Sequence, residues 1–307
     1  MRLLRAGHFK LDGGSMFGLI PRSVWSRSVA SDDRGRITVQ HNCLLLERHG
    51  TPPPGEFSPR LVLIETGSGN KLDRKSRDIF DLEERSILEA LHEVDCRPED
   101  IEAAVVTHLH FDHAGGLTRL TRPGESGGEY GAVSSFPNAR IYAQHTEWED
   151  ALANRSVMTR TYFRSHLDPI RVQVTTTDSP RPFASGYKPG REELPPTPVE
   201  LRLTPIFPGL EVFLVPGHTW GQQAITFTDT DGRTIVFTPD VMPTIHHVGA
   251  AYSLGYDVEP FTSMVSRHWF LEDACVNRWT LVLDHEPGHP VHRVKRNDRG
   301  WFDLEPA

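Results

Sequence analysis

The sequence predicts an α/β protein in which helices pack on mixed β-sheets. Short apolar runs of strand length recur along the chain, and most are bounded by Gly, Pro or Asp. Between these runs lie segments whose apolar residues recur at helical spacing. The runs that predict strands are Cys43–Leu46, Leu61–Ile64, Ala103–Val106, Val212–Val215, Ala224–Phe227, Thr234–Phe237 and Thr280–Leu283.

Three segments between the runs are expected to be helical. Apolar residues from Leu82 to Leu91 recur at helix-like spacing, and Pro98 follows them, as it often does after a helix. Trp148 and Leu152 are spaced as on one face of a second helix. The stretch around Phe261–Ala274 predicts a third.

Three stretches rich in Pro, Gly or Ser are expected to be surface loops. They lie near residues 51–59, 122–135 and 175–198, and long loops are unusual unless they carry function or are mobile. The sequence shows no internal repeat and no interdomain linker. We therefore expect a single domain over residues 1–307 with an N-terminal extension over residues 1–36.

Composition narrows the class of protein. The net charge of −8 disfavours a broad nucleic-acid surface, which needs a basic patch. No stretch approaches the ~20 apolar residues that span a bilayer, and the first residues lack the apolar core of a signal peptide. Cys43, Cys96 and Cys275 are far apart and form no CxxC pair, which fits a reducing compartment. We expect a cytoplasmic protein that acts on a small molecule, with no nucleic acid or membrane partner. A homo-oligomer stays open.

The stretch Thr107–Gly116 holds a dense cluster of metal-binding residue types directly after a predicted strand. Residues two apart in an extended segment point the same way, so His108 and His110 can reach one metal ion. Asp112 and His113 follow where the chain turns towards a pair of glycines, and they can serve a second ion beside the first. Imidazole and carboxylate suit zinc and its neighbours, so this cluster predicts a metal site.

Three further potential ligands each follow another predicted strand. They are His218, Asp240 and His285. Open α/β sheets place ligands outside the carboxyl ends of their strands. A single His after a strand is more often a capping or surface residue, but together with the first cluster these residues favour one metal site.

Residues beside the ligands are candidates to orient them. They are Thr107, Thr219, Asp284 and Glu65. Each is equally well explained as a turn or cap residue, because Thr and Asp often serve there.

The pattern His-x-His-x-Asp-His, followed by a distant His, Asp and His, resembles the metallo-β-lactamase superfamily from about residue 39 to residue 285. The resemblance implies a four-layer αβ/βα sandwich with two mixed sheets, outer helices and a site at one edge of the sheets. It implies that His108, His110 and His218 hold the first metal. It also implies that Asp112, His113 and His285 hold the second metal and that Asp240 bridges the two.

The local sequence His108–Gly116 resembles the branch that contains N-acyl-homoserine lactonases and methyl-parathion hydrolases. The stretch Leu11–Gly18 is similar to N-terminal segments of that branch, which can help to form a wall over the substrate. The resemblance implies a dinuclear metal-dependent hydrolase that uses a metal-bridging hydroxide on a small ester, lactone or phosphotriester. Zinc is the first expectation for the two divalent ions, with manganese, iron or cobalt as alternatives. Asp112 is the expected metal ligand and proton acceptor. Candidate substrate contacts are Met16, Phe17, Phe111 and Tyr256.

The sequence departs from the family pattern at three positions, and two of them bear on the class of substrate. Glu65 stands where members usually carry the Asp of an Asp-Thr-Gly motif. Pro243 takes the place of a substrate-contacting Tyr of the lactonases, which disfavours lactones unless Tyr252 or Tyr256 approaches from a nearby loop. Asp240 stands where zinc β-lactamases commonly have a Cys ligand, which disfavours β-lactams.

Three alternative functions stay open. A nuclease on the same fold would need a basic groove, which the acidic balance disfavours. A mononuclear iron oxidoreductase, such as a persulfide dioxygenase, would need an open redox metal with fewer protein ligands. The presence of both His113 and His285 favours two metals instead. The complete ligand set disfavours a non-catalytic binding module.

Overall fold

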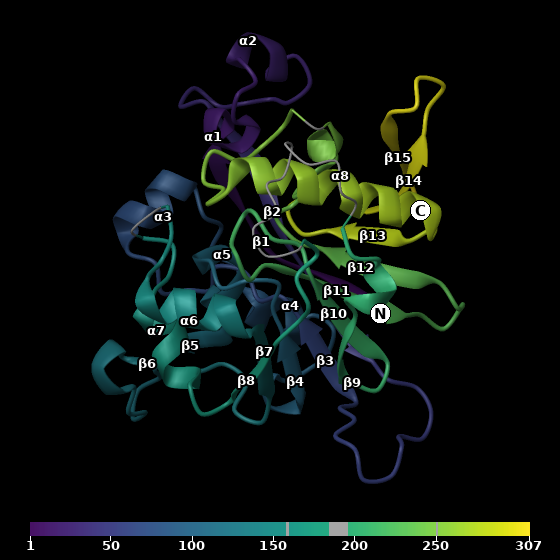
Figure 1. Cartoon of the computed structure of the whole chain (residues 1–307). Coiled ribbons are helices and arrows are strands. Elements are labelled where there is room, and N and C mark those ends of the chain that lie inside the picture. The colour runs from purple at the N-terminus through teal and green to yellow at the C-terminus, as the bar shows by residue number, and fades with distance from the viewer. Residues whose placement is uncertain (158–159, 184–195, 250) are drawn as a thin grey trace. The chain divides into compact units, whose positions relative to one another are not determined.

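The chain separates into two compact units, and the computed structural model describes its residues 1–157, 160–183, 196–249 and 251–307 (Figure 1). Unit 1 consists of Met1–Lys10 and Gln40–Thr177, and unit 2 of Leu11–Val39 and Asp178–Ala307. The expectation of a single domain over residues 1–307 stays a prediction.

Unit 1 is built on a mixed six-stranded sheet with the order β1-β2-β3-β4-β7-β8. Strand β2 runs antiparallel to β3, whereas β3, β4, β7 and β8 are parallel. Strands β5 and β6 form a separate antiparallel pair. The strands are β1 (Arg2–Asp12), β2 (Arg36–Glu47), β3 (Leu61–Ile64), β4 (Ala103–Val105), β5 (Thr118–Leu120), β6 (Ala132–Ser134), β7 (Arg140–Gln144) and β8 (Val174–Thr177). Strands β1 and β2 each extend over the boundary into unit 2.

Short helices connect the strands of unit 1. They are α3 (Arg74–Phe80), α4 (Ile87–His92), α5 (Phe111–Ala114), α6 (His145–Ala153) and α7 (Arg164–Leu167), with the 3₁₀ turns η1 (Pro98–Asp100), η2 (Gly115–Leu117), η3 (Gly128–Tyr130) and η4 (Asp168–Ile170). The predicted helix over 82–91 begins only at Ile87, because Ser86 caps α4 in a capping box with Glu89. Ile87 of α4 and Ala151 of α6 pack into the same apolar core as Leu63 of β3.

Unit 2 is built on a mixed seven-stranded sheet with the order β15-β14-β13-β12-β11-β10-β9. Strands β12 and β13 are parallel, and the other neighbouring pairs are antiparallel. The strands are β9 (Thr204–Phe207), β10 (Leu210–Leu214), β11 (Gln223–Thr228), β12 (Thr234–Thr238), β13 (Thr280–Leu283), β14 (Val291–Arg296) and β15 (Phe302–Pro306).

The long helix α8 (Pro260–Val276) covers the sheet of unit 2 (Figure 1). Its buried side packs Phe270 and Leu271 into the same core as Val236 and Leu281 of the sheet. Burial of each such side chain contributes about 1.5–3 kcal/mol. The helices of unit 2 are α1 (Gly13–Phe17), α2 (Arg22–Trp25) and α8 (Pro260–Val276), with the 3₁₀ turns η5 (Val199–Leu201) and η6 (Ile245–Val248).

The predicted α/β class with two mixed sheets is confirmed. All seven apolar runs predicted as strands lie in strands, although Val106 and Val215 fall just after β4 and β10. Helices α6 and α8 confirm the other two predicted helices.

The predicted N-terminal extension and one of the predicted loops contain helices and strands. Residues 1–36 contribute β1, α1 and α2, and residues 51–59 hold no helix or strand. Residues 122–135 contain η3 and β6. The loop near 175–198 begins inside β8, and residues 184–195 lie outside the described part of the chain. None of the helices in the described part is long and apolar enough to cross a bilayer.

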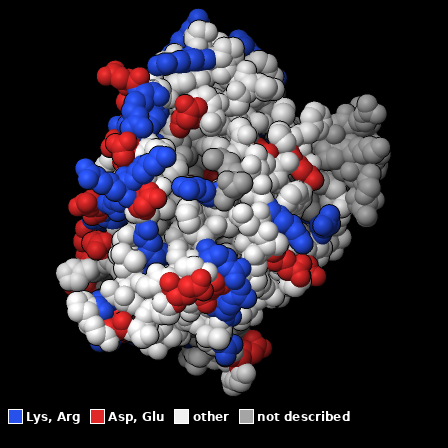
Figure 2. All heavy atoms as spheres, turned by 90° about the vertical axis from the view of Figure 1, so that its left-hand side faces the viewer, with Lys and Arg blue, Asp and Glu red and all other residues white. Residues whose placement is uncertain are grey.

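Charges of both signs are interspersed on the face drawn in Figure 2. Unit 1 also contains ion pairs, for example Arg119 with Glu125 at 2.7 Å. A nucleic-acid groove needs a stripe of one sign, and the face drawn shows none. That nucleic acid is no partner stays a prediction.

Candidate metal centre

The ligand-rich turn of unit 1 begins directly after β4. His108 and His110 follow the strand, His110 precedes α5 with an extended backbone, and α5 then carries Asp112 and His113. The ring centroid of His108 lies 4.5 Å from that of His110 and 3.9 Å from that of His113. An oxygen of Asp112 lies 4.0 Å from Nε2 of His113. All four side chains are buried, so the turn gathers three imidazoles and a carboxylate away from water.

Glu65 holds the two ends of this turn. Its Oε1 accepts a hydrogen bond of 2.6 Å from the backbone N–H of Thr107, and its Oε2 lies 3.3 Å from Nδ1 of His113. Glu65 adopts a left-handed backbone with φ 65°, which is strained for a residue with a side chain. The Thr107 hydroxyl lies 3.0 Å from Nδ1 of His108. Glu65 and Thr107 thus contact the predicted ligands, in positions that orient them.

The two glycines after the turn permit a close backbone contact. A Cβ on Gly116 would lie 2.1 Å from the carbonyl oxygen of Thr66, and a Cβ on Gly115 would lie 2.2 Å from that of Ser68. The N–H and hydroxyl of Thr66 both donate to the carbonyl of His113. The loop after β3 therefore packs directly against the turn.

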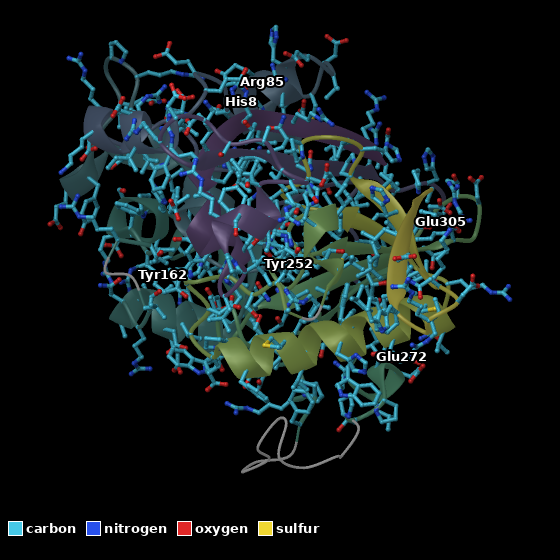
Figure 3. The ribbon with its side chains drawn as sticks, turned by 90° about the horizontal axis from the view of Figure 1, so that it is seen from above. His8, Arg85, Tyr162, Tyr252, Glu272 and Glu305 are labelled. Carbon is cyan, nitrogen blue, oxygen red and sulfur yellow. The ribbon has the colours of Figure 1, made fainter. Side chains whose placement is uncertain are left out.

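Sequence reasoning missed two charged residues that hold the same turn, the buried Glu147 and the partly buried Lys71. Glu147 of α6 accepts hydrogen bonds of 2.9 Å from the N–H of Leu109 and from the hydroxyl of Tyr162, which is labelled in Figure 3. Burial and the Glu147 carboxylate raise the pKa of Tyr162. Lys71 donates to the carbonyls of Gly115 and of Thr118, and burial lowers the pKa of Lys71 to about 7. Neither residue carries a local sequence signal, because each reaches the turn only through the fold.

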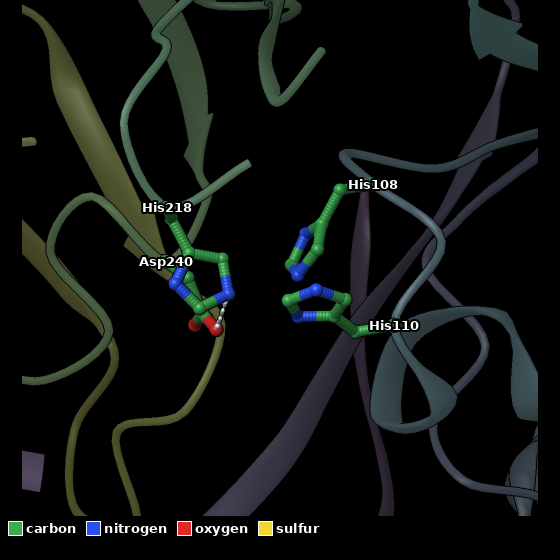
Figure 4. A group of neighbouring side chains, drawn as sticks. All are labelled: His108, His110, His218 and Asp240. Atoms are coloured by element: carbon green, nitrogen blue, oxygen red, sulfur yellow. Dashed lines mark ion pairs between the residues drawn. The ribbon is translucent and has the colours of Figure 1, made fainter. Parts of the chain in front are cut away.

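In unit 2, Asp240 lies between two imidazoles. Its Oδ2 is 3.1 Å from Nε2 of His218, the pair joined by the dashed line in Figure 4, and its Oδ1 is 3.3 Å from Nε2 of His285. The three residues follow β10, β12 and β13, and all are buried. Asp284 offers a further carboxylate oxygen within 4.8 Å of the ligand atoms of Asp240 and His285. The predicted convergence of His218, Asp240 and His285 is thus found within this unit.

Asp257 is another functional candidate that sequence reasoning missed. Its Oδ1 lies 2.9 Å from Nδ1 of His218, and both side chains are buried. A carboxylate can only accept, so Asp257 accepts from Nδ1–H of His218, and a neutral ring protonated at Nδ1 is the form in which Nε2 can bind a metal ion. No sequence motif marks Asp257, because it lies in an irregular loop before α8.

Three of the four predicted substrate contacts lie together in unit 2. Met16 and Phe17 of α1 are 1% and 0% exposed, and Phe17 stacks on His247 at 5.2 Å between ring centroids. The Tyr256 hydroxyl donates to Sδ of Met16 at 2.6 Å, and its ring centroid lies 6.0 Å from that of His218.

Phe111, the fourth candidate, belongs to unit 1. It packs among aromatic rings, 4.9 Å from Phe80 and 6.3 Å from Phe163 between centroids. The substrate roles of Phe111 and of the three residues in unit 2 stay predictions.

The donor sets within each unit fit divalent metal ions. His108 and His110 offer ligand atoms within 4.8 Å of one another in unit 1, as do Asp240, Asp284 and His285 in unit 2. Neutral imidazoles and carboxylates are the donors that zinc and its neighbours prefer. Burying neighbouring carboxylates such as Asp240 and Asp284 is costly unless positive charge compensates them, and a bound cation would supply that charge.

Comparison with known proteins assigns the family. The model of the metallo-beta-lactamase superfamily matches residues 38–274. An N-acyl homoserine lactonase from Bacillus thuringiensis is 24% identical over 186 residues, which cover 60% of this chain and 56% of that relative. The chain thus spans little more than half the length of this curated relative.

Three solved structures share the fold over nearly the whole chain. A probable metal-dependent hydrolase from Staphylococcus aureus has a TM-score of 0.73 at 23% identity and covers 100% of this chain and 96% of its own. The hydrolase AbOPH has a TM-score of 0.70 at 19% identity, and the dizinc quorum-quenching lactonase AidC has 0.69 at 17%. Each of these two covers 99% of this chain and 93% of its own. The predicted family and fold are therefore confirmed, and the chain belongs to the metallo-β-lactamase superfamily.

Proposed function

We propose that this chain is a hydrolase that depends on two divalent metal ions and acts on a small ester, lactone or phosphotriester. The observation that carries the proposal is the geometry of Asp240, whose two oxygens face two different imidazoles, His218 and His285. A carboxylate arranged in this way can serve two metal ions at once. Membership of the superfamily, and similarity to a lactonase and to metal-dependent hydrolases, support the same function.

The proposed ligands come from both units. His108, His110 and His218 would hold one ion, and Asp112, His113 and His285 would hold the other, with Asp240 between them. When bound, the ions would supply acidification of water, whose pKa of 15.7 a divalent metal can lower to about 7, so that a nucleophile would be available at neutral pH. Zinc is the proposed metal, in keeping with its imidazole and carboxylate ligands and with the dizinc lactonase of similar fold.

Residues of the chain would orient the ligands and move the proton. Glu65 would hold His113, and the Thr107 hydroxyl would hold His108. Asp112 is proposed to accept the proton released during attack, because its buried carboxylate is shielded from bulk water.

The substrate class is inferred from the relatives and from the residues around His218. Pro243 provides no phenol where the lactonases have one. Tyr256 lies beside His218 and is proposed to make the corresponding contact. Met16, Phe17 and Phe111 are proposed to shape the apolar part of the site.

A hydrolysis screen tests the proposed function. The full chain, loaded with zinc, would be assayed on lactones, aryl esters, phosphotriesters, thioesters and β-lactams, beside the variant His108→Ala. We expect hydrolysis of a lactone, aryl ester or phosphotriester, and a loss of kcat/KM of at least about 100-fold in the variant. If protein that holds two metal ions hydrolysed none of these three substrate classes, the proposal would be rejected. A single bound iron in protein purified without added metal would favour the oxidoreductase.

A further inference from the structure

We infer that residues 13–18, which form α1 and its end, act as a brace that positions the metal ligand His218 through the loop 253–257. We call residues 13–18 the brace. The brace, the loop 253–257 and His218 all belong to unit 2. The inference rests on the proposed metal site. It assigns these N-terminal residues a role in metal binding in addition to their predicted place in a substrate wall.

The loop fixes His218 by side chain and by backbone. Oδ1 of Asp257 accepts from Nδ1–H of His218, and Oδ2 of Asp257 accepts from the N–H of Leu254 at 3.3 Å. The N–H of Val258 donates to the carbonyl of His218 at 3.2 Å. Both the ring and the backbone of this ligand therefore follow any movement of the loop.

A buried arginine of α8 balances the charge of Asp257. Arg267 is 1% exposed, and its guanidinium donates to the carbonyl of Val241 at 3.5 Å. Burial lowers the pKa of Arg267 to about 10, whereas the Asp257 carboxylate acts in the opposite direction. Val241 directly follows Asp240. Arg267 therefore interacts both with Asp257, which holds His218, and with the backbone next to the proposed ligand Asp240.

The brace is attached to this loop by direct hydrogen bonds. The N–H of Gly255 donates to the carbonyl of Ser15 at 2.7 Å, and the Tyr256 hydroxyl donates to Sδ of Met16. Nε2 of His247 lies 2.8 Å from the carbonyl of Met16, which can only accept. Since Met16 and Phe17 are buried, the brace is part of the interior of unit 2.

Gly18 makes the contact between brace and loop sensitive to a single substitution. A Cβ at Gly18 would lie 2.4 Å from the carbonyl oxygen of Ser253. Gly18→Ala must therefore push the brace and the loop apart. Gly300 is a control in the same unit, because it also has a positive φ but has no heavy atom within 4 Å of the position of a Cβ. Gly18→Ala and Gly300→Ala both place a side chain at a positive φ, but only Gly18→Ala also creates the clash.

The first experiment measures metal affinity of the full chain by competition with a chromogenic chelator, using zinc alone as the probe. We expect Gly18→Ala and Asp257→Ala to bind one of the two ions about 10–100-fold more weakly, as when partners behind a metal ligand are removed. Gly300→Ala and Asp273→Asn, a half-buried carboxylate of unit 2 away from the ligands, should stay within about twofold of wild type. Circular dichroism and thermal unfolding verify that each variant is folded. Gly18→Ala protein that binds zinc as tightly as wild type would overturn the brace.

The second experiment needs no metal. Nitrogen NMR of ¹⁵N-histidine-labelled, metal-free full chain reports which ring nitrogen of His218 carries the proton, with His218→Ala to assign the signal. Wild type should show a proton on Nδ1, and Asp257→Ala should lower the population of Nδ1–H, because the carboxylate that accepts from it is removed. An unchanged tautomer in Asp257→Ala would overturn the positioning role of Asp257.

The two experiments separate the inference from the proposed function. If the wild type binds no zinc, or if His218→Ala binds it as well as wild type does, the proposed metal site fails. In that case the tautomer of His218 still tests the contact with Asp257. If His218→Ala loses zinc while Gly18→Ala does not, the brace alone fails.

Discussion

The two units supply the proposed ligands in different ways. In unit 1 the ligands lie within one short turn, from His108 to His113, and buried acids hold the backbone of that turn. In unit 2 the ligands come from three separated strand ends, and they face one another, with Asp240 between His218 and His285. The turn of unit 1 is thus held by Glu65 and Glu147, which lie outside the proposed ligand set. In unit 2, Asp240 contacts two other proposed ligands, and His218 is also held by Asp257. This difference predicts where substitutions act on metal binding and where they act on stability.

The largest expected effect is on metal binding in unit 2. Asp240→Asn removes the carboxylate that two imidazoles share, so we expect zinc affinity to fall by at least about 100-fold. Asp112→Asn removes a carboxylate that lies 4.0 Å from Nε2 of His113, farther than Asp240 lies from either of its imidazoles, and it should cost less. Elemental analysis after dialysis against a chelator would compare the two variants. Equal losses would remove the contrast between the units.

The next effect is on the stability of unit 1. Glu65→Ala leaves the buried N–H of Thr107 without this acceptor and removes a carboxylate beside Nδ1 of His113, so it should cost about 3 kcal/mol of unfolding free energy. Urea denaturation of the metal-free chain measures this change. The control is Glu125→Ala, a surface partner of Arg119, which should cost less than about 1 kcal/mol. A loss as small as that of the control would show that Glu65 does not fix the turn.

The two units should also differ in how their stability depends on pH, and Asp273 tests this in unit 2. Burial raises its pKa to about 6, against the attraction of Arg202 and with repulsion from Glu200 and Glu272. Between the usual value of 3.8 and about 6 the folded state binds the extra proton, so this group stabilises the fold at low pH and loses that contribution as the pH rises. We expect about 2 kcal/mol less stability at pH 7 than at pH 4 from this group.

Asp273→Asn isolates this contribution. The difference between the unfolding free energies of wild type and variant should move in favour of the variant as the pH rises from 4 to 7. A difference that stays constant over this range would contradict the raised pKa. In unit 1, Lys71 should give the opposite slope above pH 7, because burial lowers its pKa to about 7.

The smallest effect concerns single hydroxyl groups. Tyr162→Phe removes a hydrogen bond to the buried Glu147 carboxylate and should cost about 1 kcal/mol. Tyr256→Phe removes a bond to the sulfur of Met16, a weak acceptor, and should cost less than about 0.5 kcal/mol. Denaturation of the metal-free variants compares them. The reverse order would mean that the supports of unit 1 are weaker than those of unit 2.

The same difference explains how much the sequence predicts. The turn from His108 to His113 is recognisable because its ligands are local, and each ligand of unit 2 follows an apolar run that predicts a strand. The strands themselves are predictable because they are buried and bounded by Gly, Pro or Asp. The family pattern then combines these local signals into one ligand set.

The residues behind the ligands are not predictable in this way. Glu147, Lys71 and Asp257 reach the turn or His218 from distant parts of the sequence, and none belongs to a spaced motif. Their contacts depend on the path of the folded backbone. Glu65 is the exception, because the Glu-Thr-Gly motif directly follows a predicted strand.

The division of the chain into units has a consequence for protein engineering. Unit 2 is discontinuous, because it draws on both Leu11–Val39 and Asp178–Ala307. A gene split after Thr177 would place residues 13–18 in one fragment and His218, Asp240 and His285 in the other. Unit 2 could then form only if the N-terminal fragment inserted its residues Leu11–Val39 into the C-terminal fragment. A split protein would therefore need a different cut site, or a circular permutation that keeps Leu11–Val39 with the C-terminal fragment.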